Sequence, residues 1–211
     1  KLLRQACSKY NIHLIADEIA VGFGRTGSMF AYEQSKITPD IICLSKGITG
    51  GYMTLSTILT TDQIYNAFYD EYTKLNAFLH SHSYTANPIA CAAANASLDL
   101  FEKNNVIEKN KILSNYIHNS LKDLYEHPHV SDVRQHGMIA AIEVVKNKLT
   151  KEPYDWKERR GMLAYQYGLK NNVLIRPLGN VIYFMPPYVI KKKEIDKVIN
   201  VIKAAIDVAT K

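Results

Sequence analysis

Apolar runs of strand length alternate with polar and glycine-rich segments near the start of the chain. The runs are Ile12–Ala16, Ile41–Leu44 and Ser56–Thr60. The first two are short and are followed by polar residues, which is typical of buried strands. About ten residues separate the second run from the third, which is too short for the crossover that a parallel pair needs. We therefore expect the last two strands to be antiparallel and the sheet to be mixed.

Helical spacing of apolar side chains predicts helices before and after this sheet. Residues 2–10 are predicted to be the end of a helix, and Val106–Tyr125 has one apolar face. Asn87-Pro88 is a typical helix start, with Asn as the cap and Pro at the first helical position. The run that follows, Ile89–Phe101, is apolar nearly all round, which predicts a buried helix.

The pattern changes from about Val130 onward, where short strands and helices are mixed in a way typical of an α+β domain. The predicted strands are Val130–Arg134, Ile139–Val145, Val173–Ile175 and Val181–Phe184. The predicted helices are Trp156–Tyr167 and Lys193–Ala209. We therefore expect an α/β fold in two parts, with residues 1–105 in a large domain and residues 106–211 in a small α+β domain.

The composition is that of an ordinary globular protein. Hydrophobic residues make up 47% of the chain, and because no run of about 18 apolar residues occurs, no membrane span is expected. The formal net charge is +6. The basic residues are scattered, and the densest run, Lys191–Lys193, is followed by Glu194, so we expect a solvated helix there and no nucleic-acid partner. Cys7, Cys43 and Cys91 are widely spaced, which favours free thiols in a reducing compartment such as the cytoplasm.

A glycine-rich loop, Gly22–Gly27, has the spacing of the dinucleotide-binding fingerprint. That fingerprint follows its strand directly, and its acidic partner ends the next strand. Here the loop begins five residues after Asp17, and Asp40 begins a strand instead of ending one. The context therefore disfavours a nicotinamide-dependent dehydrogenase, which stays as an alternative.

Two ionisable groups follow the first two predicted strands. Asp17 and Glu18 end the first strand, at the edge where α/β proteins build their sites. They are either solvated loop acids or include one carboxylate that pairs with a cationic ligand group. Lys46 follows the second strand and precedes Gly47. A lysine in this place is costly to bury unless it is used, and its amine is a nucleophile toward carbonyl groups.

Other polar residues suggest ligand contacts more weakly. Ser83 precedes the helix that starts at Pro88, and hydroxyl and amide groups near a helix N-terminus suit a phosphate. Arg176 follows an apolar run and is either a surface ion-pair residue or a bidentate ligand for a carboxylate. His80 and His82 alternate without further ligands at suitable spacing, which makes a poor metal site.

Several of these segments together resemble the class-III, fold-type-I aminotransferases that depend on pyridoxal 5′-phosphate (PLP). The segments that carry this resemblance are Leu14–Ile19, Gly22–Gly27 and Ser45–Gly51. Further segments resemble the branch of the family that acts in biotin biosynthesis, namely Met53–Ser56, His80–Pro88, Arg176–Gly179 and Met185–Tyr188. The resemblance covers essentially the whole chain.

The resemblance implies a role for each candidate. Lys46 would form a Schiff base with PLP and move protons during catalysis. Asp17 would pair with the protonated pyridine nitrogen. Ser83 would bind the phosphate group held by a neighbouring subunit, and Arg176 would bind the carboxylate of the substrate. It also implies a homodimer with its site at the subunit interface.

The expected reaction is amino-group transfer from S-adenosylmethionine to 8-amino-7-oxononanoate. Lysine is an alternative donor, and another ω-aminotransferase, acting on ornithine or 4-aminobutyrate, is an alternative activity. Because the family is about twice this length, we expect the chain to be a C-terminal half, with residues 1–105 as the second part of the PLP-binding domain. A fragment that only dimerises is the alternative without enzymatic activity.

Overall fold

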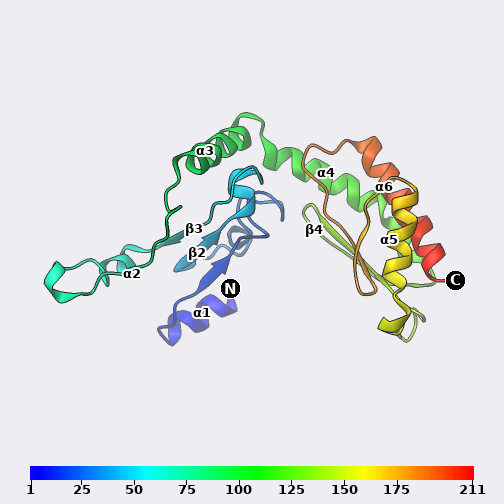
Figure 1. Cartoon of the computed structure of the whole chain (residues 1–211). Coiled ribbons are helices and arrows are strands. Elements are labelled where there is room, and N and C mark those ends of the chain that lie inside the picture. Colours follow the sequence, from blue (N-terminus) through cyan, green and yellow to red (C-terminus); the bar gives the residue numbers. More distant parts are fainter. The chain divides into compact units, whose positions relative to one another are not determined.

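The chain folds into two units, Lys1–Ile107 and Glu108–Lys211, in the computed structural model, which describes residues 1–211 (Figure 1). Each unit contains its own sheet. None of the helices is long and apolar enough to cross a membrane.

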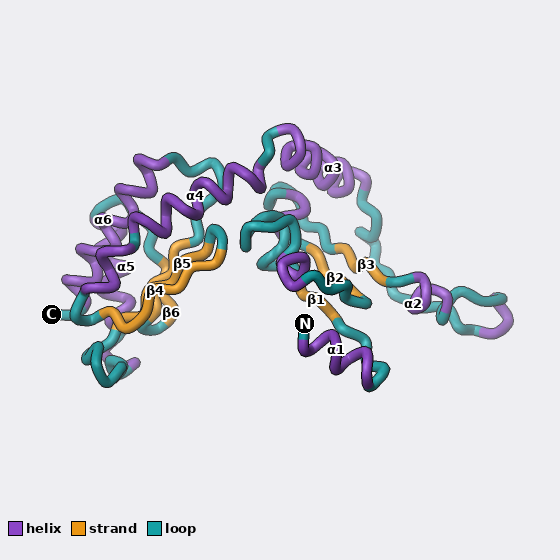
Figure 2. Tube along the Cα trace, turned by 180° about the vertical axis from the view of Figure 1, so that it is seen from behind, coloured by secondary structure: helices purple, strands orange, loops and turns teal.

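The first unit is built on a three-stranded sheet in the order β1-β2-β3 (Figure 2). Its strands are β1 (Ile15–Asp17), β2 (Ile41–Leu44) and β3 (Thr57–Thr60). β1 and β2 are parallel, with Asp17 opposite Cys43. β2 and β3 are antiparallel, with Leu44 opposite Thr57. The predicted mixed sheet and its antiparallel pair are therefore confirmed.

Short helices connect and flank these strands. The α-helices are α1 (Leu2–Lys9), α2 (Asp62–Asn66) and α3 (Pro88–Lys103), and the 3-10 helices are η1 (Ala31–Ser35), η2 (Lys46–Thr49) and η3 (Tyr72–Lys74). The predicted start of α3 is confirmed, because Asn87 Oδ1 accepts hydrogen bonds from the backbone N–H groups of Ile89 (3.0 Å) and Ala90 (3.2 Å).

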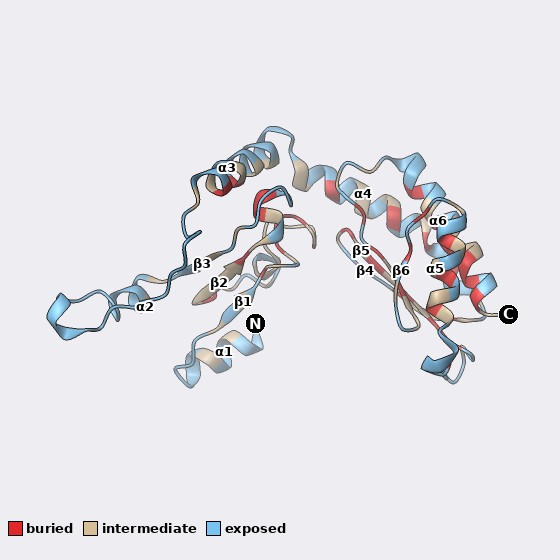
Figure 3. Cartoon of the chain, viewed as in Figure 1, coloured by how far each residue is buried: buried red, intermediate tan, exposed pale blue.

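The first unit buries little of its apolar surface within this chain. Its core is a small cluster of buried residues, Phe23, Leu44, Ile48 and Ala94, with partly buried neighbours around it. The prediction of a buried helix at Ile89–Phe101 is wrong, since only Ala90 and Ala94 of α3 are buried (Figure 3). The expected buried strand at Ile12–Ala16 is also largely exposed. In both cases only one face of the element packs on the rest of the unit.

Asp40 anchors α1 to the start of the sheet. Its carboxylate accepts hydrogen bonds from the Leu14 backbone N–H and from the Arg4 guanidinium, each at 2.6 Å. The backbone N–H and then Arg4 hold the pKa of Asp40 below its usual value. This carboxylate is therefore occupied by a structural contact, which argues against the role of a ribose ligand in a dinucleotide site.

The second unit is an α+β domain, as predicted. Its antiparallel sheet has the order β4-β5-β7-β6. The strands are β4 (Val130–His136), β5 (Ile139–Val144), β6 (Arg176–Leu178) and β7 (Val181–Phe184). The helices are α4 (Val106–Ser120), α5 (Arg160–Lys170) and α6 (Lys192–Ala209), with the 3-10 turns η4 (Lys122–Glu126) and η5 (Trp156–Glu158). The apolar face of α6 supplies much of the core, through Ile195, Ile199, Ile202 and Ile206.

Three predicted elements in this unit have wrong boundaries. The expected helix at Val106–Tyr125 ends at Ser120 as α4, and residues 122–126 form the separate 3-10 turn η4. The expected strand at Val173–Ile175 is irregular, and the strand begins at Arg176 instead. Pro177 lies within this strand, which is possible because β6 is at the edge of the sheet. The expected helix at Trp156–Tyr167 is interrupted, because η5 ends at Glu158, Arg159 has a left-handed φ of +51°, and α5 begins at Arg160.

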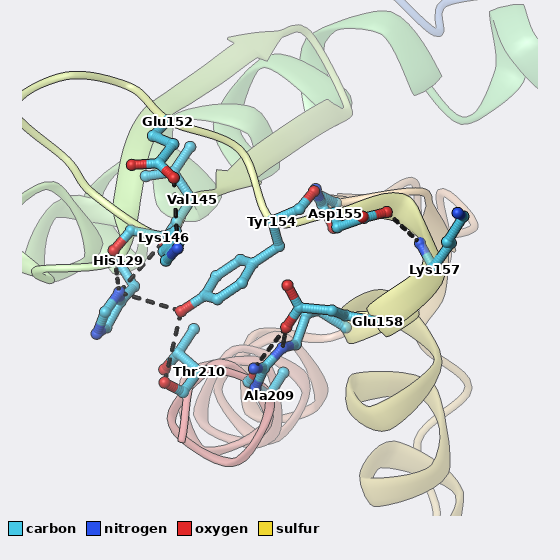
Figure 4. Close-up of polar contacts among 12 residues, drawn as sticks. His129, Val145, Lys146, Glu152, Tyr154, Asp155, Lys157, Glu158, Ala209 and Thr210 are labelled. Carbon is cyan, nitrogen blue, oxygen red and sulfur yellow. Dashed lines mark hydrogen bonds and ion pairs between the residues drawn. The ribbon is translucent and has the colours of Figure 1, made fainter.

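Tyr154 holds the C-terminal end of α6 in place (Figure 4). Its side chain is buried, and its hydroxyl lies 3.3 Å from His129 Nδ1 and 3.5 Å from the Thr210 carbonyl oxygen. The Arg160 guanidinium lies 4.6 Å from the centre of the Tyr154 ring and donates a hydrogen bond to the Ala209 carbonyl (3.0 Å). A cation near the last carbonyls of a helix is stabilising, so these contacts fix α6 against the rest of the unit.

Gly161→Ala is expected to destabilise the second unit, although alanine favours a helix over glycine by about 1 kcal/mol. A Cβ at this position would lie 2.2 Å from the Gly179 carbonyl oxygen and 2.7 Å from Pro177 Cβ. Thermal unfolding of the full-length protein should therefore occur at a lower temperature in this variant. Gln166→Ala, on an exposed position of the same helix, is the control and should leave the midpoint within experimental error. Equal midpoints for both variants would contradict this close approach.

Candidate functional site

The parallel pairing of β1 and β2 brings Asp17 and Lys46 to the same edge of the sheet. Asp17 is the last residue of β1 and lies opposite Cys43 of β2. The Glu18 backbone N–H continues the ladder by donating to the Cys43 carbonyl (3.0 Å). Lys46 lies two residues after the last residue of β2, at the carboxyl end of that strand. The carboxyl edge of a parallel strand pair is where α/β proteins place ligands.

The structure distinguishes the two neighbouring acids. Asp17 is exposed at the sheet edge, and its Oδ1 accepts the backbone N–H of Ile19 (3.0 Å). Glu18 is 2% exposed, and its two carboxylate oxygens accept the backbone N–H groups of Ala31 and Tyr32, each at 2.9 Å. Glu18 therefore holds the first turn of η1, and Asp17 is the acid that remains accessible to a ligand.

Lys46 combines an accessible amine with a constrained backbone. Its side chain is exposed and makes no hydrogen bond or ion pair within this chain. Its φ is +48°, in the left-handed region that side chains other than glycine rarely adopt. Ser45, just before it, donates from Oγ to the Leu55 carbonyl (2.8 Å). An amine without a partner at a fixed position suits a nucleophile toward a carbonyl group.

Glu18→Gln is expected to lower the free energy of unfolding by about 2–3 kcal/mol, because a hydrogen bond to a charged group is lost and a part-buried N–H loses its acceptor. The glutamine amide has one acceptor oxygen in place of two, so Ala31 or Tyr32 would face an NH₂ group. Denaturant unfolding of the full-length protein measures this loss. Glu33→Gln is the matched control, because Glu33 is exposed and accepts only a longer bond, from the Phe30 N–H (3.3 Å). Similar losses for both variants would show that burial of Glu18 does not matter.

Ser83 is on an exposed turn ahead of α3. At the N-terminus of α3, Asn87 Oδ1 already accepts the backbone N–H groups of Ile89 and Ala90. Any phosphate contact of Ser83 would therefore come from the turn and not from the helix end. His82 lies in the same exposed segment, where its Nδ1 accepts the Tyr84 backbone N–H (3.1 Å).

Arg176 lies in the second unit, as the exposed first residue of β6. It lines an open cavity of about 540 Å³. Apolar residues form much of the wall, and Lys191, Glu194 and Lys197 add charged groups. Arg176 has no ion-pair partner within this chain, so its guanidinium is available to a carboxylate.

The structure thus brings Asp17 and Lys46 together at one sheet edge and places Ser83 and Arg176 elsewhere in the chain. The glycine-rich loop leads from Gly22 into η1, a five-residue 3-10 helix. A dinucleotide fingerprint opens an α-helix whose N-terminus binds the pyrophosphate, and this loop does not. The structural use of Glu18 was not predicted, and its only signal in the sequence is its position next to Asp17.

The chain belongs to the class-III aminotransferase family, whose model matches residues 1–206. Members of this family use PLP. The fold is that of the fold-type-I transferases, as predicted, and the alternative of a nicotinamide-dependent dehydrogenase is wrong.

More specific similarity is to one enzyme of the family. The chain is 54% identical to the adenosylmethionine-8-amino-7-oxononanoate aminotransferase of Helicobacter pylori, over 94% of this chain and 45% of that protein. It is 49% identical to the enzyme of the same name from Geobacter sulfurreducens, over 100% of this chain and 46% of that protein. The crystal structure of the Methanocaldococcus jannaschii enzyme superimposes with a TM-score of 0.93 at 42% identity, covering 97% of this chain and 48% of the other. The chain therefore spans about half the length of the relatives it matches.

Proposed function

We propose that the full-length protein is a PLP-dependent aminotransferase in which Lys46 binds the cofactor covalently. The observation that carries this proposal is the placement of an accessible lysine and an accessible carboxylate at the ends of two adjacent parallel strands. The residues fit the group chemically, because an unpaired amine suits the aldehyde of PLP and a carboxylate suits a protonated pyridine. Residues 1–105 would form part of the cofactor-binding domain, and residues 106–211 the small domain.

Each residue then has a separate task. Bound PLP supplies an electron sink for negative charge next to the transferred amino group. Asp17 keeps the proton on the pyridine nitrogen, since its negative charge favours the protonated form. With the cofactor bound, the Lys46 amine would take the proton from the substrate carbon that bears the amino group and would deliver it to the cofactor carbon on the other side of the amino nitrogen, two bonds away. A single flexible amine can serve both positions because its four-carbon stem is long and rotatable.

We assign 8-amino-7-oxononanoate as the acceptor and S-adenosylmethionine as the donor. The names of the related enzymes support both. The acceptor carries a carboxylate at the end of a hydrocarbon chain, which suits the cavity at Arg176, with its guanidinium, its apolar wall and its volume of about 540 Å³. Cavities of this size hold small ligands. Lysine as donor and other ω-amines as substrates are the competing assignments.

We also propose a homodimer, in which Ser83 of one subunit contacts the cofactor phosphate of the other. The segment around Ser83 supports this, because its apolar side chains are exposed in a single chain; Phe78 is 68% and Leu79 94% exposed. Water-exposed apolar patches of this kind mark interaction sites. Sedimentation of the full-length protein measures its mass in solution.

The three free cysteines support a reducing location, the cytoplasm.

Borohydride reduction followed by peptide mapping tests the central assignment. The reductant fixes PLP onto the lysine that holds it, so the expected result is a mass increase confined to the peptide that contains Lys46. Steady-state assays with S-adenosylmethionine and with lysine, each paired with the oxo acid, then identify the donor. Attachment at another lysine, or none at all, would refute the proposed function.

Arg176→Ala is expected to lower kcat/KM for the oxo acid. The loss of transition-state stabilisation should be about 2–4 kcal/mol, since each hydrogen bond to a charged group contributes roughly 1.5–3 kcal/mol. The cofactor absorbance should stay unchanged. Arg176→Lys retains the charge but not the planar fork that matches a carboxylate, so it should recover only part of the loss. Lys191→Ala removes a cation from the same cavity and serves as the control.

The methyl ester of the acceptor makes this test specific, because an ester cannot form the ion pair. The wild-type enzyme should prefer the acid strongly, and Arg176→Ala should not. If both enzymes show the same preference of acid over ester, Arg176 does not bind the carboxylate and the substrate assignment loses its structural support.

A further inference from the structure

The turn that carries Lys46 packs directly on the glycine-rich loop that follows β1. A Cβ added to Gly47 would lie 2.8 Å from both Cβ and Cδ2 of Phe23. Cβ atoms do not approach other atoms this closely, so only glycine fits beside this ring without a shift. The residue after Lys46 is therefore in contact with a side chain from a different part of the sequence.

The Phe23 ring is itself held firmly. It is 2% exposed. It packs edge-to-face on Phe30, with ring centres 5.6 Å apart, and is tilted against Phe101 of α3 at 6.3 Å. Aromatic pairs at such distances add to the stabilisation that burial provides. The side chain of Phe23 is therefore fixed in its position against Gly47.

The backbone of Lys46 needs such support. Its left-handed φ of +48° persists only where the surroundings fix it. Leu44 and Ile48 are buried on either side of it. From α3, Ser97 Oγ donates to the Gly47 carbonyl (3.4 Å). Gly47 therefore lies between Phe23 and α3, and the direction of the Lys46 side chain depends on both.

We propose that Phe23 is a positioning residue for Lys46, whose backbone conformation it fixes through the contact with Gly47. The glycine-rich loop Gly22–Gly27, which does not bind a dinucleotide, would then serve to support the turn that carries Lys46. The inference rests on the proposed role of Lys46 only for its catalytic consequence. The structural consequence, a rigid turn at residues 45–50, is testable without activity.

Phe23→Leu in the full-length enzyme is the test. Leucine keeps the Cβ, Cγ and Cδ2 atoms that lie nearest to Gly47, but it lacks the rest of the ring. The ring contacts with Phe30 and Phe101 that hold those atoms in place are therefore lost, and the turn can relax. The turn amides of Ile48 and Gly50, which bond to the carbonyls of Ser45 (3.2 Å) and Gly47 (3.1 Å), should exchange hydrogen faster in the cofactor-free protein. The value of kcat should fall by about 10²-fold, the order expected for a reacting group misplaced by about 1 Å, while KM changes little.

Phe30→Leu is the matched control. It removes an aromatic ring from the same cluster and with it one of the ring contacts of Phe23. The atoms nearest to Gly47, however, all belong to Phe23 and none to Phe30. Its unfolding midpoint should fall by a similar amount, while exchange at Ile48 and Gly50 and the value of kcat stay near wild type. Gly47→Ala changes the same contact from the other side and replaces Phe23→Leu if that variant does not fold.

The results separate this inference from the proposed function. The inference is supported if exchange in the turn is faster and kcat is lower in Phe23→Leu but not in Phe30→Leu. Unchanged exchange, or equal changes in Phe23→Leu and Phe30→Leu, overturn it even when borohydride attaches the cofactor to Lys46. Faster exchange in the turn with unchanged kcat also overturns it, because the turn would then not position the catalytic amine. Failure of borohydride to label Lys46 in the wild-type protein overturns the proposed function and leaves the exchange result to be judged by itself.

Discussion

Replacement of Lys46 by alanine is expected to abolish covalent attachment of PLP and to lower the rate of amino transfer by about 10²–10⁴-fold or more, the range for loss of a positioned acid–base group. The effect should be this large because one side chain supplies both the covalent link and the proton transfer. The fold should persist, because Lys46 is exposed and makes no polar contact within the chain. Single-turnover kinetics of the full-length variant, with circular dichroism as a check on folding, measure both expectations.

Lys36→Ala is a closely matched control for this variant. Lys36 is also an exposed lysine in the first unit, and its φ of +50° places it in the same left-handed region. Any cost of replacing a lysine in that backbone conformation is therefore common to both variants. Near-normal turnover in Lys46→Ala, or an equal loss in Lys36→Ala, would remove Lys46 from the catalytic site.

The sequence predicted the parts of the fold that depend on local pattern. The length of the connection between β2 and β3 required an antiparallel pair, and the structure has one. The cap at Asn87 and the apolar face of α6 were predicted for similar reasons, since a cap and a helical period involve residues close in sequence.

Burial was predicted less well, because it depends on what covers an element and not on the element alone. α3 is apolar on nearly every face, yet only Ala90 and Ala94 are buried. The strand that was expected before Arg176 begins at Arg176 itself, since pairing with β7 aligns Arg176 with Tyr183. Neither the partner of a face nor the register of a strand pair is encoded in a single segment.

The candidate site likewise has one feature that the local sequence pattern predicted and others that it did not. Its position at the carboxyl end of two strands follows from the sequence pattern, but the choice between Asp17 and Glu18 does not. Asp17 is the last residue of β1 and Glu18 comes next, and alternation of side chains along an extended backbone sends them to opposite sides. Only the structure shows that the backbone of η1 occupies the Glu18 carboxylate. The contact between Phe23 and Gly47 joins residues far apart in sequence and could not be predicted either.

Asp17→Asn is expected to leave PLP attached to Lys46 but to slow the half-reaction with the amino donor by about 10³-fold, the order seen when one preorganised electrostatic contact is removed. Asparagine has the same shape as aspartate, and its Oδ1 can still accept the Ile19 N–H that Asp17 accepts at 3.0 Å. The turn after β1 should therefore stay intact, and the change is confined to the charge.

The reason for the loss is electrostatic. A neutral amide does not favour a proton on the pyridine nitrogen, so the pKa of that nitrogen falls and less negative charge can be stabilised next to the transferred amino group. Stopped-flow absorbance with a single turnover of donor measures the rate, and Asp99→Asn, on an exposed position of α3, controls for loss of a surface carboxylate. Because Glu18 is committed to Ala31 and Tyr32, it cannot substitute for Asp17. An unchanged half-reaction rate in Asp17→Asn would mean that neither acid contacts the cofactor, and the assignment of this sheet edge as the cofactor site would fail with it.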